Sequence, residues 1–427
     1  MQNDLVTKWT KHVEKNEEKH STVKDLLLAT CPLRFLNNSA NQVSEVSATE
    51  RIRTRVNLEF GLWLRKTLIR ALGKDFSSAP DGLLDNLRTG LLGTYRNRNV
   101  VLHLAEDACD PGQLKSWSLR WELSTIALLT GEDRFLLLLV DSANQKHEEV
   151  ACQVEARTWL ADLLVDPPAI KKSCSDCPFS EVCPTESRLS EDWLAEAPAP
   201  PKIVKLVSSV SGFMGRAEPS IIYDVNQYLL DRAKTNRRPL GYHPSTIGKE
   251  VEEEVPCIRV LYYDATGAKK APFPATMYWI FNMGHAWHHV LQKIAKECDP
   301  NIHVELPVKV GRLVGHADLV DSTTIIDIKS KSRHSGSTPK GYIGQVHCYG
   351  WGAGKKQGAI LTAYKSTGAL EEKTFPLQEL LFSRLSQMIV EADAFVDAGE
   401  EPPRFEGASA SNSRCKACYF RETCWDG

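Results

Sequence analysis

A pattern of three cysteines occurs twice in this chain and restricts the possible folds more than any other feature. Each copy has the spacing Cys-x-x-Cys-x-Phe-x-Glu-x-Cys, so a phenylalanine and a glutamate recur together with the thiols. Self-similarity of this kind is typical of duplicated structural units, and it predicts two related modules. The copies comprise Cys174, Cys177 and Cys183, and Cys415, Cys418 and Cys424.

One further cysteine precedes each triplet at a distance comparable to the length of a small domain. Cys31 lies in the sequence Thr-Cys-Pro-Leu-Arg, and Cys257 lies in the similar sequence Pro-Cys-Ile-Arg. Four thiolates suit either a structural zinc site or a four-iron, four-sulfur cluster, and composition does not separate the two. Either centre would join the two ends of a module. The other four cysteines are expected to be unpaired core thiols: Cys109, Cys152, Cys298 and Cys348.

The segment AEAPAPPK, residues 195–202, has the composition of a stiff proline-rich linker. It divides the chain into a first module, residues 1–194, and a second module, residues 203–427. Each module would contain one distant cysteine and one triplet.

The composition is that of a soluble globular protein, with 42% hydrophobic and 25% charged residues among 427. The longest purely apolar run, Phe135 to Val140, is too short to cross a membrane, and the charged first twenty residues lack a secretory signal. We therefore expect a cytoplasmic protein that does not bind membranes. Because the cytoplasm is reducing, its twelve cysteines are expected to ligate metals rather than form disulfides. The net charge of −2 gives no global attraction to a polyanion, so nucleic-acid binding would need local cations and metal ions.

Candidate catalytic residues follow one another in the second half. The runs HVELPVKV, GRLVGHADLVD and TTIIDIKS predict three short β-strands. Asp327 and Lys329 lie two apart on the third run, so both point to one face while Ile328 turns to the core, and a hairpin would bring Asp318 beside them. Two converging carboxylates bind Mg²⁺ or Mn²⁺, and a neighbouring ammonium can orient a water. This combination suits the hydrolysis of phosphodiesters.

Two helical patterns flank these strands. The segment 281–296 is predicted to be helical and separates Gly284 from His288 by one turn. After the strands, Gln345 and Tyr349 stand at i and i+4 and therefore on one helical face. Each pair has an ordinary structural interpretation by itself, whereas the combination in this order is far more specific.

Taken together, the motifs resemble the iron-sulfur branch of the PD-(D/E)XK nucleases, which contains the AddB nuclease domain and the CRISPR-associated iron-sulfur exonucleases, with the RecB nuclease domain as a close relative. The resemblance covers roughly Tyr242 to Trp425. It rests on Gly284-x-x-x-His288, GHAD ending at Asp318, Asp327-Ile-Lys329, and Gln345-x-x-x-Tyr349, framed by Cys257 and the final cysteine triplet.

The resemblance implies a role for each of these residues. His288, Asp318, Asp327 and the main-chain carbonyl of Ile328 would hold the catalytic metal, and Lys329 would be the catalytic lysine. Gln345 and Tyr349 would position the lysine and the DNA strand. Four thiols would ligate a four-iron, four-sulfur cluster in the second module, and four would do so in the first. These sets are Cys257, Cys415, Cys418 and Cys424, and Cys31, Cys174, Cys177 and Cys183.

Alignment of the two halves indicates that the first has lost its catalytic residues. Gly61 to Arg65 falls where Gly284 to His288 stands, so a guanidinium replaces the imidazole. Val101 to Ala105 falls where residues 325–329 stand, so His103 takes the place of the acid. In the same way Glu122 and Ile126 replace the glutamine and the tyrosine. We expect a degenerate copy in which Arg65 contacts DNA phosphate.

The predicted fold is α/β, with two tandem restriction-endonuclease-like modules, each a small mixed sheet flanked by helices and joined by a four-cysteine cluster. The predicted function is a metal-dependent DNA nuclease, exonucleolytic on single strands or ends, in repair, recombination, phage or defence processing. The alternative is a non-catalytic DNA-end-binding scaffold subunit of a larger complex. No Walker GxxxxGK[ST] loop occurs, so a helicase activity would belong to a partner protein.

Overall fold

The structure is a computed structural model. It describes residues 48–79, 89–96, 98–105, 108–109, 119, 123, 126–127, 130, 132–141, 146–154, 203–205, 221–235, 238–332 and 338–425. The linker at residues 195–202 and the first-half thiols Cys31, Cys174, Cys177 and Cys183 lie outside these residues, as does Glu122.

The first half contributes a mixed six-stranded sheet with the strand order β1-β2-β3-β4-β5-β6. Its neighbouring strands are antiparallel except for the parallel pair β3 and β4. β6 follows the proline-rich segment in sequence yet pairs with β5, so the boundary expected at residue 203 moves beyond Lys205. The strands are β1 (Phe76–Ser78), β2 (Thr89–Tyr95), β3 (Arg98–Ala105), β4 (Arg134–Asp141), β5 (Lys146–Val154) and β6 (Ile203–Lys205).

The second half contributes a mixed five-stranded sheet with the order β11-β10-β9-β8-β7. The pairs β7–β8, β8–β9 and β10–β11 are antiparallel, and β9 and β10 are parallel. This sequence of pairings is the same as that of β1 to β5 in the first sheet. The strands are β7 (His303–Val310), β8 (Leu313–Val320), β9 (Thr324–Lys331), β10 (Gln357–Tyr364) and β11 (Leu370–Pro376).

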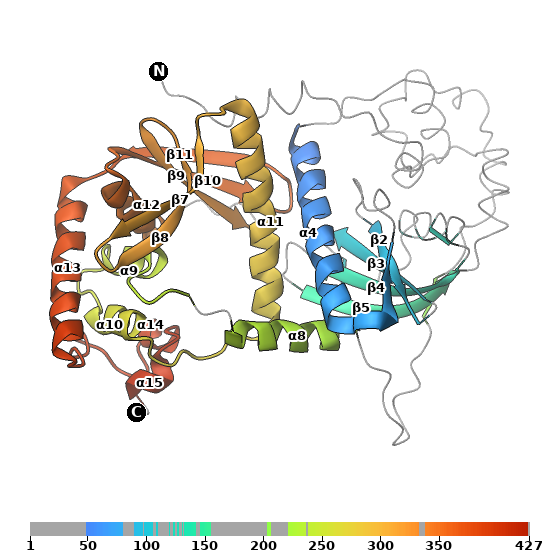
Figure 1. Ribbon diagram of the computed structural model, residues 1–427, viewed down its shortest axis with the longest axis horizontal. Coiled ribbons are helices and arrows are strands. Elements are labelled where there is room, and N and C mark those ends of the chain that lie inside the picture. Colours follow the sequence, from blue (N-terminus) through green and yellow to red (C-terminus); the bar gives the residue numbers. More distant parts are fainter. Residues whose placement is uncertain are drawn as a thin grey trace.

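Two long helices lie between the sheets, α4 (Ala48–Leu72) and α11 (Ala275–Cys298), as Figure 1 shows in blue and gold. α12 (Lys340–Ala353) covers the opposite face of the second sheet, where Val346 and Tyr349 pack on Ile325 and Ile360. The other helical elements are η1 (Gly73–Asp75), α8 (Ile221–Thr235), α9 (Pro244–Glu250), α10 (Ile258–Thr266), α13 (Glu379–Ala398), α14 (Ser413–Lys416) and α15 (Arg421–Trp425).

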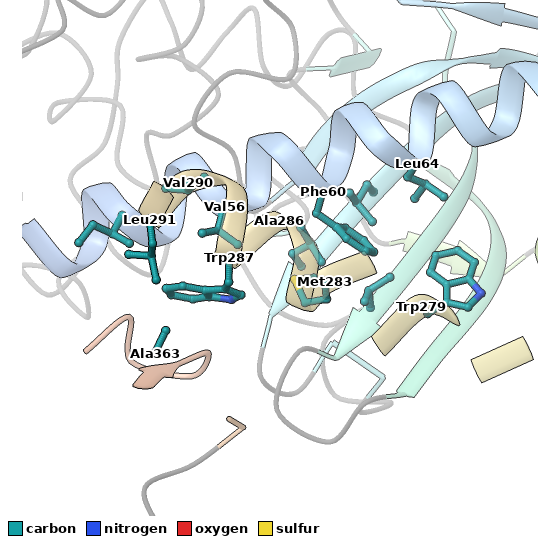
Figure 2. Close-up of a cluster of buried hydrophobic side chains, with 14 of the residues drawn as sticks. Val56, Phe60, Leu64, Trp279, Met283, Ala286, Trp287, Val290, Leu291 and Ala363 are labelled. Carbon is teal, nitrogen blue, oxygen red and sulfur yellow. The ribbon is translucent and has the colours of Figure 1, made fainter. Parts of the chain in front are cut away.

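The contact between α4 and α11 forms the centre of one continuous hydrophobic core (Figure 2). On α4 an apolar residue recurs every fourth position from Ile52 through Phe60 to Leu68, which places these side chains on one buried face. α11 presents Trp279 and Trp287 to this face. Inward-facing residues of both sheets belong to this same core.

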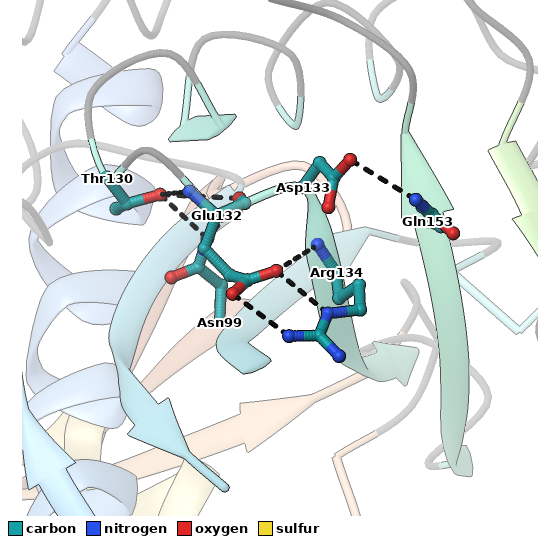
Figure 3. A network of polar contacts seen from close by, with 6 residues as sticks. All are labelled: Asn99, Thr130, Glu132, Asp133, Arg134 and Gln153. Carbon is teal, nitrogen blue, oxygen red and sulfur yellow. Dashed lines mark hydrogen bonds and ion pairs between the residues drawn. The ribbon is translucent and has the colours of Figure 1, made fainter. Parts of the chain in front are cut away.

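A polar network fixes the start of the parallel pair in the first sheet (Figure 3). The side chain of Asn99, fully buried at the start of β3, donates to Thr130 Oγ1 at 2.8 Å and to the carbonyl of Glu132 at 2.9 Å. Glu132 Oε1 then accepts from the backbone N–H of Arg134 at 3.1 Å. These bonds hold the connection that leads into β4 against the first residues of β3.

The described architecture confirms the α/β prediction of two mixed sheets flanked by helices. Among the described helices, none is both long and apolar enough to cross a membrane.

Candidate active site

The proposed acids meet where two strands separate. β8 and β9 pair at Leu319–Ile326 and Val320–Ile325, and the ladder ends there. At the next position the backbone N–H of Ile328 donates to Asp318 Oδ2 at 2.7 Å, so a carboxylate takes the place of a strand carbonyl. The Asp318 side chain thereby lies beside Asp327 and Ile328, in the hairpin that the sequence predicts.

The point where β8 and β9 separate is called the fork. His288 approaches this fork from α11. Its Nδ1 lies 3.3 Å from Asp318 Oδ1. Burial by itself would lower the pKa of His288, but the hydrogen bond and negative charge of Asp318 raise it. In turn, burial favours the neutral form of Asp318, but the hydrogen bond and charge of His288 and the charge of Lys329 hold the pKa of Asp318 below its usual value. The contact therefore stabilises the charged form of each partner relative to burial alone.

Asp327 and Lys329 form the second charged pair. Lys329 Nζ lies 2.7 Å from Asp327 Oδ2. Burial raises the pKa of Asp327 to about 6 in spite of the lysine, because the carboxyl group is almost completely enclosed. The contact is an ion pair without hydrogen-bond geometry, and among the described residues Asp327 Oδ2 accepts no hydrogen bond. This buried oxygen retains lone pairs for another cation.

Residues of α12 orient the lysine. Gln345 Oε1 accepts from Lys329 Nζ at 3.1 Å, and Gln345 Nε2 lies 3.4 Å from Tyr349 OH. Both α12 side chains are buried, which limits their movement. The position of α12 depends on its close approach to α9. A Cβ added to Gly344 would lie 2.0 Å from the carbonyl oxygen of Gly248, so the approach requires a glycine here.

Sequence reasoning missed Gln292, which connects α11 to both β7 and β8. Gln292 Nε2 donates to Glu305 Oε1 at 2.6 Å and to the carbonyl of Asp318 at 3.4 Å. Glu305 has a φ of 50°, a left-handed conformation that costs on the order of 1–3 kcal/mol for a residue with a side chain. Gln292 stands one turn after His288 on α11, and this i+4 position is the signal that could have indicated it.

Comparison with known proteins gives a family for this region. Residues 261–425 match the sequence model described as the PD-(D/E)XK nuclease superfamily. The chain contains a PD-(D/E)XK nuclease domain. The match includes the strand fork, His288, Gln345 and the final cysteine triplet, and it does not reach the first sheet.

A search of solved structures matches one entitled SSO0001, with 16% identity, a TM-score of 0.32 and coverage of 47% of this chain and 94% of that chain. Two others are of the alkaline exonuclease LHK-Exo from Laribacter hongkongensis, one in complex with dAMP. They share 12% and 10% identity, with TM-scores of 0.30 and coverage of 37% of this chain and 89% of theirs. No curated protein matches the sequence.

The nuclease domain has donors suited to a divalent cation, although they are paired with one another. Among the described residues, no three His, Cys, Asp or Glu side chains form a ready-made metal cage. However, Asp318 and Asp327 offer hard anionic oxygens at one point of the fork, and one oxygen of Asp327 is buried without a hydrogen bond. This donor set fits Mg²⁺ or Mn²⁺.

The four second-half cysteines are free thiols, and three of them, Cys257, Cys418 and Cys424, pack against the same hydrophobic core. Among the described residues they do not form a group of three that could hold a metal ion. Burial raises the pKa of Cys257 to about 11. Glu250 Oε2 accepts from the backbone N–H of Cys257 at 2.8 Å and from Arg414 Nη2 at 2.5 Å, so the start of α10 is tied to the C-terminal segment.

The first sheet has no acid at the position of Asp327. His103 and Val101 lie on the same face of β3, and this face is turned to a helical segment that includes Ile126. In the second sheet, Ile325 and Asp327 likewise share the face of β9 that is turned to α12. Arg65 is 6% exposed, so it is a buried residue of α4 and not a surface cation. This burial contradicts the expectation that Arg65 contacts DNA phosphate.

Proposed function

We propose that this protein is a divalent-metal-dependent DNA nuclease acting exonucleolytically on single strands or DNA ends. The observation that carries the proposal is the fork of β8 and β9, where Asp318, Asp327 and Lys329 gather within a nuclease-superfamily domain. A scaffold that merely grips DNA would not need a lysine ion-paired with a buried aspartate of raised pKa.

In the proposed reaction His288, Asp318, Asp327 and the carbonyl of Ile328 would hold Mg²⁺ or Mn²⁺. The bound ion would stabilise the negative charge that develops on the phosphate and lower the pKa of a water. Lys329 orients the attacking water with its ammonium, and Gln345 fixes the direction of that ammonium through its side-chain oxygen. Tyr349 lies 3.4 Å from the amide nitrogen of Gln345 and would help to position the DNA strand.

We further propose a four-iron, four-sulfur cluster on Cys257, Cys415, Cys418 and Cys424, with zinc as the alternative. Support comes from the repeated cysteine spacing and from the packing of Cys257, Cys418 and Cys424 against one hydrophobic core. A corresponding first-half cluster would use Cys31 and the first triplet. An oxidised cluster absorbs visible light near ~400 nm and zinc does not, so the spectrum of anaerobically purified protein separates the two.

The two halves are proposed to descend from one duplicated module. The support is the shared sequence of strand pairings, together with His103 at the position of Asp327. On this view the first half is a catalytically inactive copy. Any helicase that opens duplex DNA for the enzyme would be a separate recombination or defence protein.

Replacement of Lys329 tests the mechanism. Lys329→Ala should lower the rate of metal-dependent cleavage of labelled single-stranded DNA by about 10²–10⁴, because the water loses its orienting cation. DNA affinity should remain within about threefold of wild type, since one cation of several is removed. Lys331→Ala is the matched control two residues further along the same strand face, and its rate should fall less than about tenfold. An unchanged rate in Lys329→Ala would remove the lysine from the mechanism.

A further inference from the structure

The N-terminal part of α11 extends beyond the second sheet. Gly284 lies opposite Ser330 near the end of β9, since a Cβ added to this glycine would be 3.5 Å from Ser330 Oγ. His288 lies at the level of Asp318, and Lys296 Nζ donates to the carbonyl of Ile302 at the other end of the sheet. The helix therefore runs along the strands, and residues 275–283 lie past the end of β9.

This extension carries aromatic side chains on the same helical face as His288. Phe281 precedes His288 by two helical turns, about 10 Å along the axis. The ring of Phe273, in the loop before α11, meets Phe281 edge to face with centroids 5.4 Å apart. Tyr278 also meets Phe281, with centroids 6.2 Å apart. The three rings form a row that leads toward the candidate active site.

The row is distinct from the buried aromatic contact on the other side of α11. Trp279 packs there against Phe60 and Trp63 of α4 and is 4% exposed. Phe273, in contrast, is 41% exposed, and the hydrophobic cores of the described residues include neither Phe273 nor Phe281. Phe273 therefore leaves ring surface open to a ligand, Phe281 beside it is half-buried, and Tyr278 also packs against the main core.

The charge around the row is complementary to a polyanion. From Gly267 to Lys296 the sequence contains no Asp or Glu. Arg238 is exposed, and its charge acts on His285, one turn after Phe281, together with the opposite charges of Glu305 and Asp318. At the end of β9 the ammonium of Lys331 lies 6.0 Å from the ring centre of Tyr342, which also lies under Lys329. Cations and rings thus alternate around the approach to the fork.

We propose that Phe281 and Phe273 form a stacking platform for the unpaired nucleobases that adjoin the cleaved phosphodiester. This inference rests on the proposed nuclease function and specifies its substrate as a strand whose bases are unstacked from a complement. Base stacking on aromatic rings tolerates every sequence, and the bases of an intact duplex are unavailable for it. The platform gives the enzyme a preference for single strands and frayed ends.

The test measures DNA affinity separately from cleavage. In the Asp327→Asn background, which keeps DNA intact, fluorescence anisotropy would give the dissociation constants of a single strand and a blunt duplex in the presence of Mg²⁺. Phe281→Ala and Phe273→Ala should each weaken single-strand binding about tenfold and leave duplex binding unchanged. Phe281→Tyr should restore single-strand binding. Leu380→Ala, which removes another exposed apolar side chain on α13, should change neither.

A strand with abasic residues supplies the second arm. If the rings hold bases, wild type should bind the abasic strand about tenfold more weakly, and Phe281→Ala should bind intact and abasic strands equally. If wild type and both alanine variants bind the intact strand equally well, and the parent enzyme cleaves DNA normally, the stacking platform is overturned and the nuclease function is retained. If the parent enzyme does not cleave DNA, but the alanine variants still lose single-strand affinity, the nuclease function is overturned and the stacking platform is retained.

Discussion

At the scale of single residues, Asp327 couples the site to pH. Burial raises its pKa to about 6, so in the absence of a metal the carboxyl group takes up a proton as the pH falls through this value. The proton and a divalent cation compete for the same oxygens. His288 acts in the same direction, because burial lowers the pKa of the imidazole but the hydrogen bond and the charge of Asp318 together raise it by more.

We therefore expect the affinity for Mn²⁺ to be nearly constant well above pH 7 and to fall by at least about tenfold per pH unit below pH 6. Isothermal titration calorimetry at pH 5 and pH 8, with catalytically unmodified protein, measures the difference. Asp327→Asn should bind weakly at both values. An affinity for Mn²⁺ that is the same at pH 5 and pH 8 would show that Asp327 is not a ligand.

Gln292 is the residue for which a positioning role can be measured. Gln292→Leu removes the donor that holds Glu305 and the carbonyl of Asp318, so the two strands lose their connection to α11. We expect Mn²⁺ affinity to fall about 10–100-fold, as is usual for partners that orient ligands. Lys293→Ala, at the next and exposed position of the helix, should have wild-type affinity. Wild-type affinity in Gln292→Leu would limit this residue to packing.

At the scale of elements, the contact of α4 with α11 determines whether the halves are independent. Phe60 is fully buried between the helices, and its ring meets that of Trp279 at 6.3 Å. Ion pairs continue the contact, since Arg55 Nη1 lies 3.6 Å from Glu297 Oε2 and His289 Nε2 lies 3.7 Å from Glu59 Oε1. These surface pairs add little free energy, so the apolar contact dominates.

Phe60→Ala should lower the free energy of unfolding by about 3–5 kcal/mol, the usual cost of deleting a buried aromatic ring. Because the core is shared, the loss should affect both sheets in one thermal transition. Ile69→Ala, at an exposed position of the same helix, should change the free energy by less than about 0.5 kcal/mol. Two transitions, of which Phe60→Ala shifts only one, would show that the halves fold separately.

The strands and the fork were accessible from sequence because they depend on local periodicity. Asp327, Ile328 and Lys329 alternate between faces as a strand requires, and Asp318 follows from a short hairpin. The bond between Gln292 and Glu305 was not predictable, since it needs the left-handed backbone of Glu305 and the exact depth of α11 on the sheet. Pairing of β6 with β5 also depends on long-range packing, which a linker composition does not reveal.

At the scale of the whole molecule, two sheets with the same pairing pattern share one core, and the acids lie at the fork of the second. In the proposed duplication, His103 on β3 and buried Arg65 on α4 take the places of Asp327 and His288, and they do not form a pair of carboxylates with a lysine. In the proposed function the second half supplies the chemistry, while the first half completes the hydrophobic environment of α11, the helix that carries His288.

The most direct test of this account is single-turnover cleavage of end-labelled single-stranded DNA with Mn²⁺, comparing wild type with Asp327→Asn. The account predicts that wild-type protein shortens the strand and that Asp327→Asn, nearly isosteric and folded to the wild-type thermal midpoint, leaves it at the level of the metal-free control. Metal-dependent cleavage by Asp327→Asn at the wild-type rate would contradict it, because the chemistry would then belong to another site.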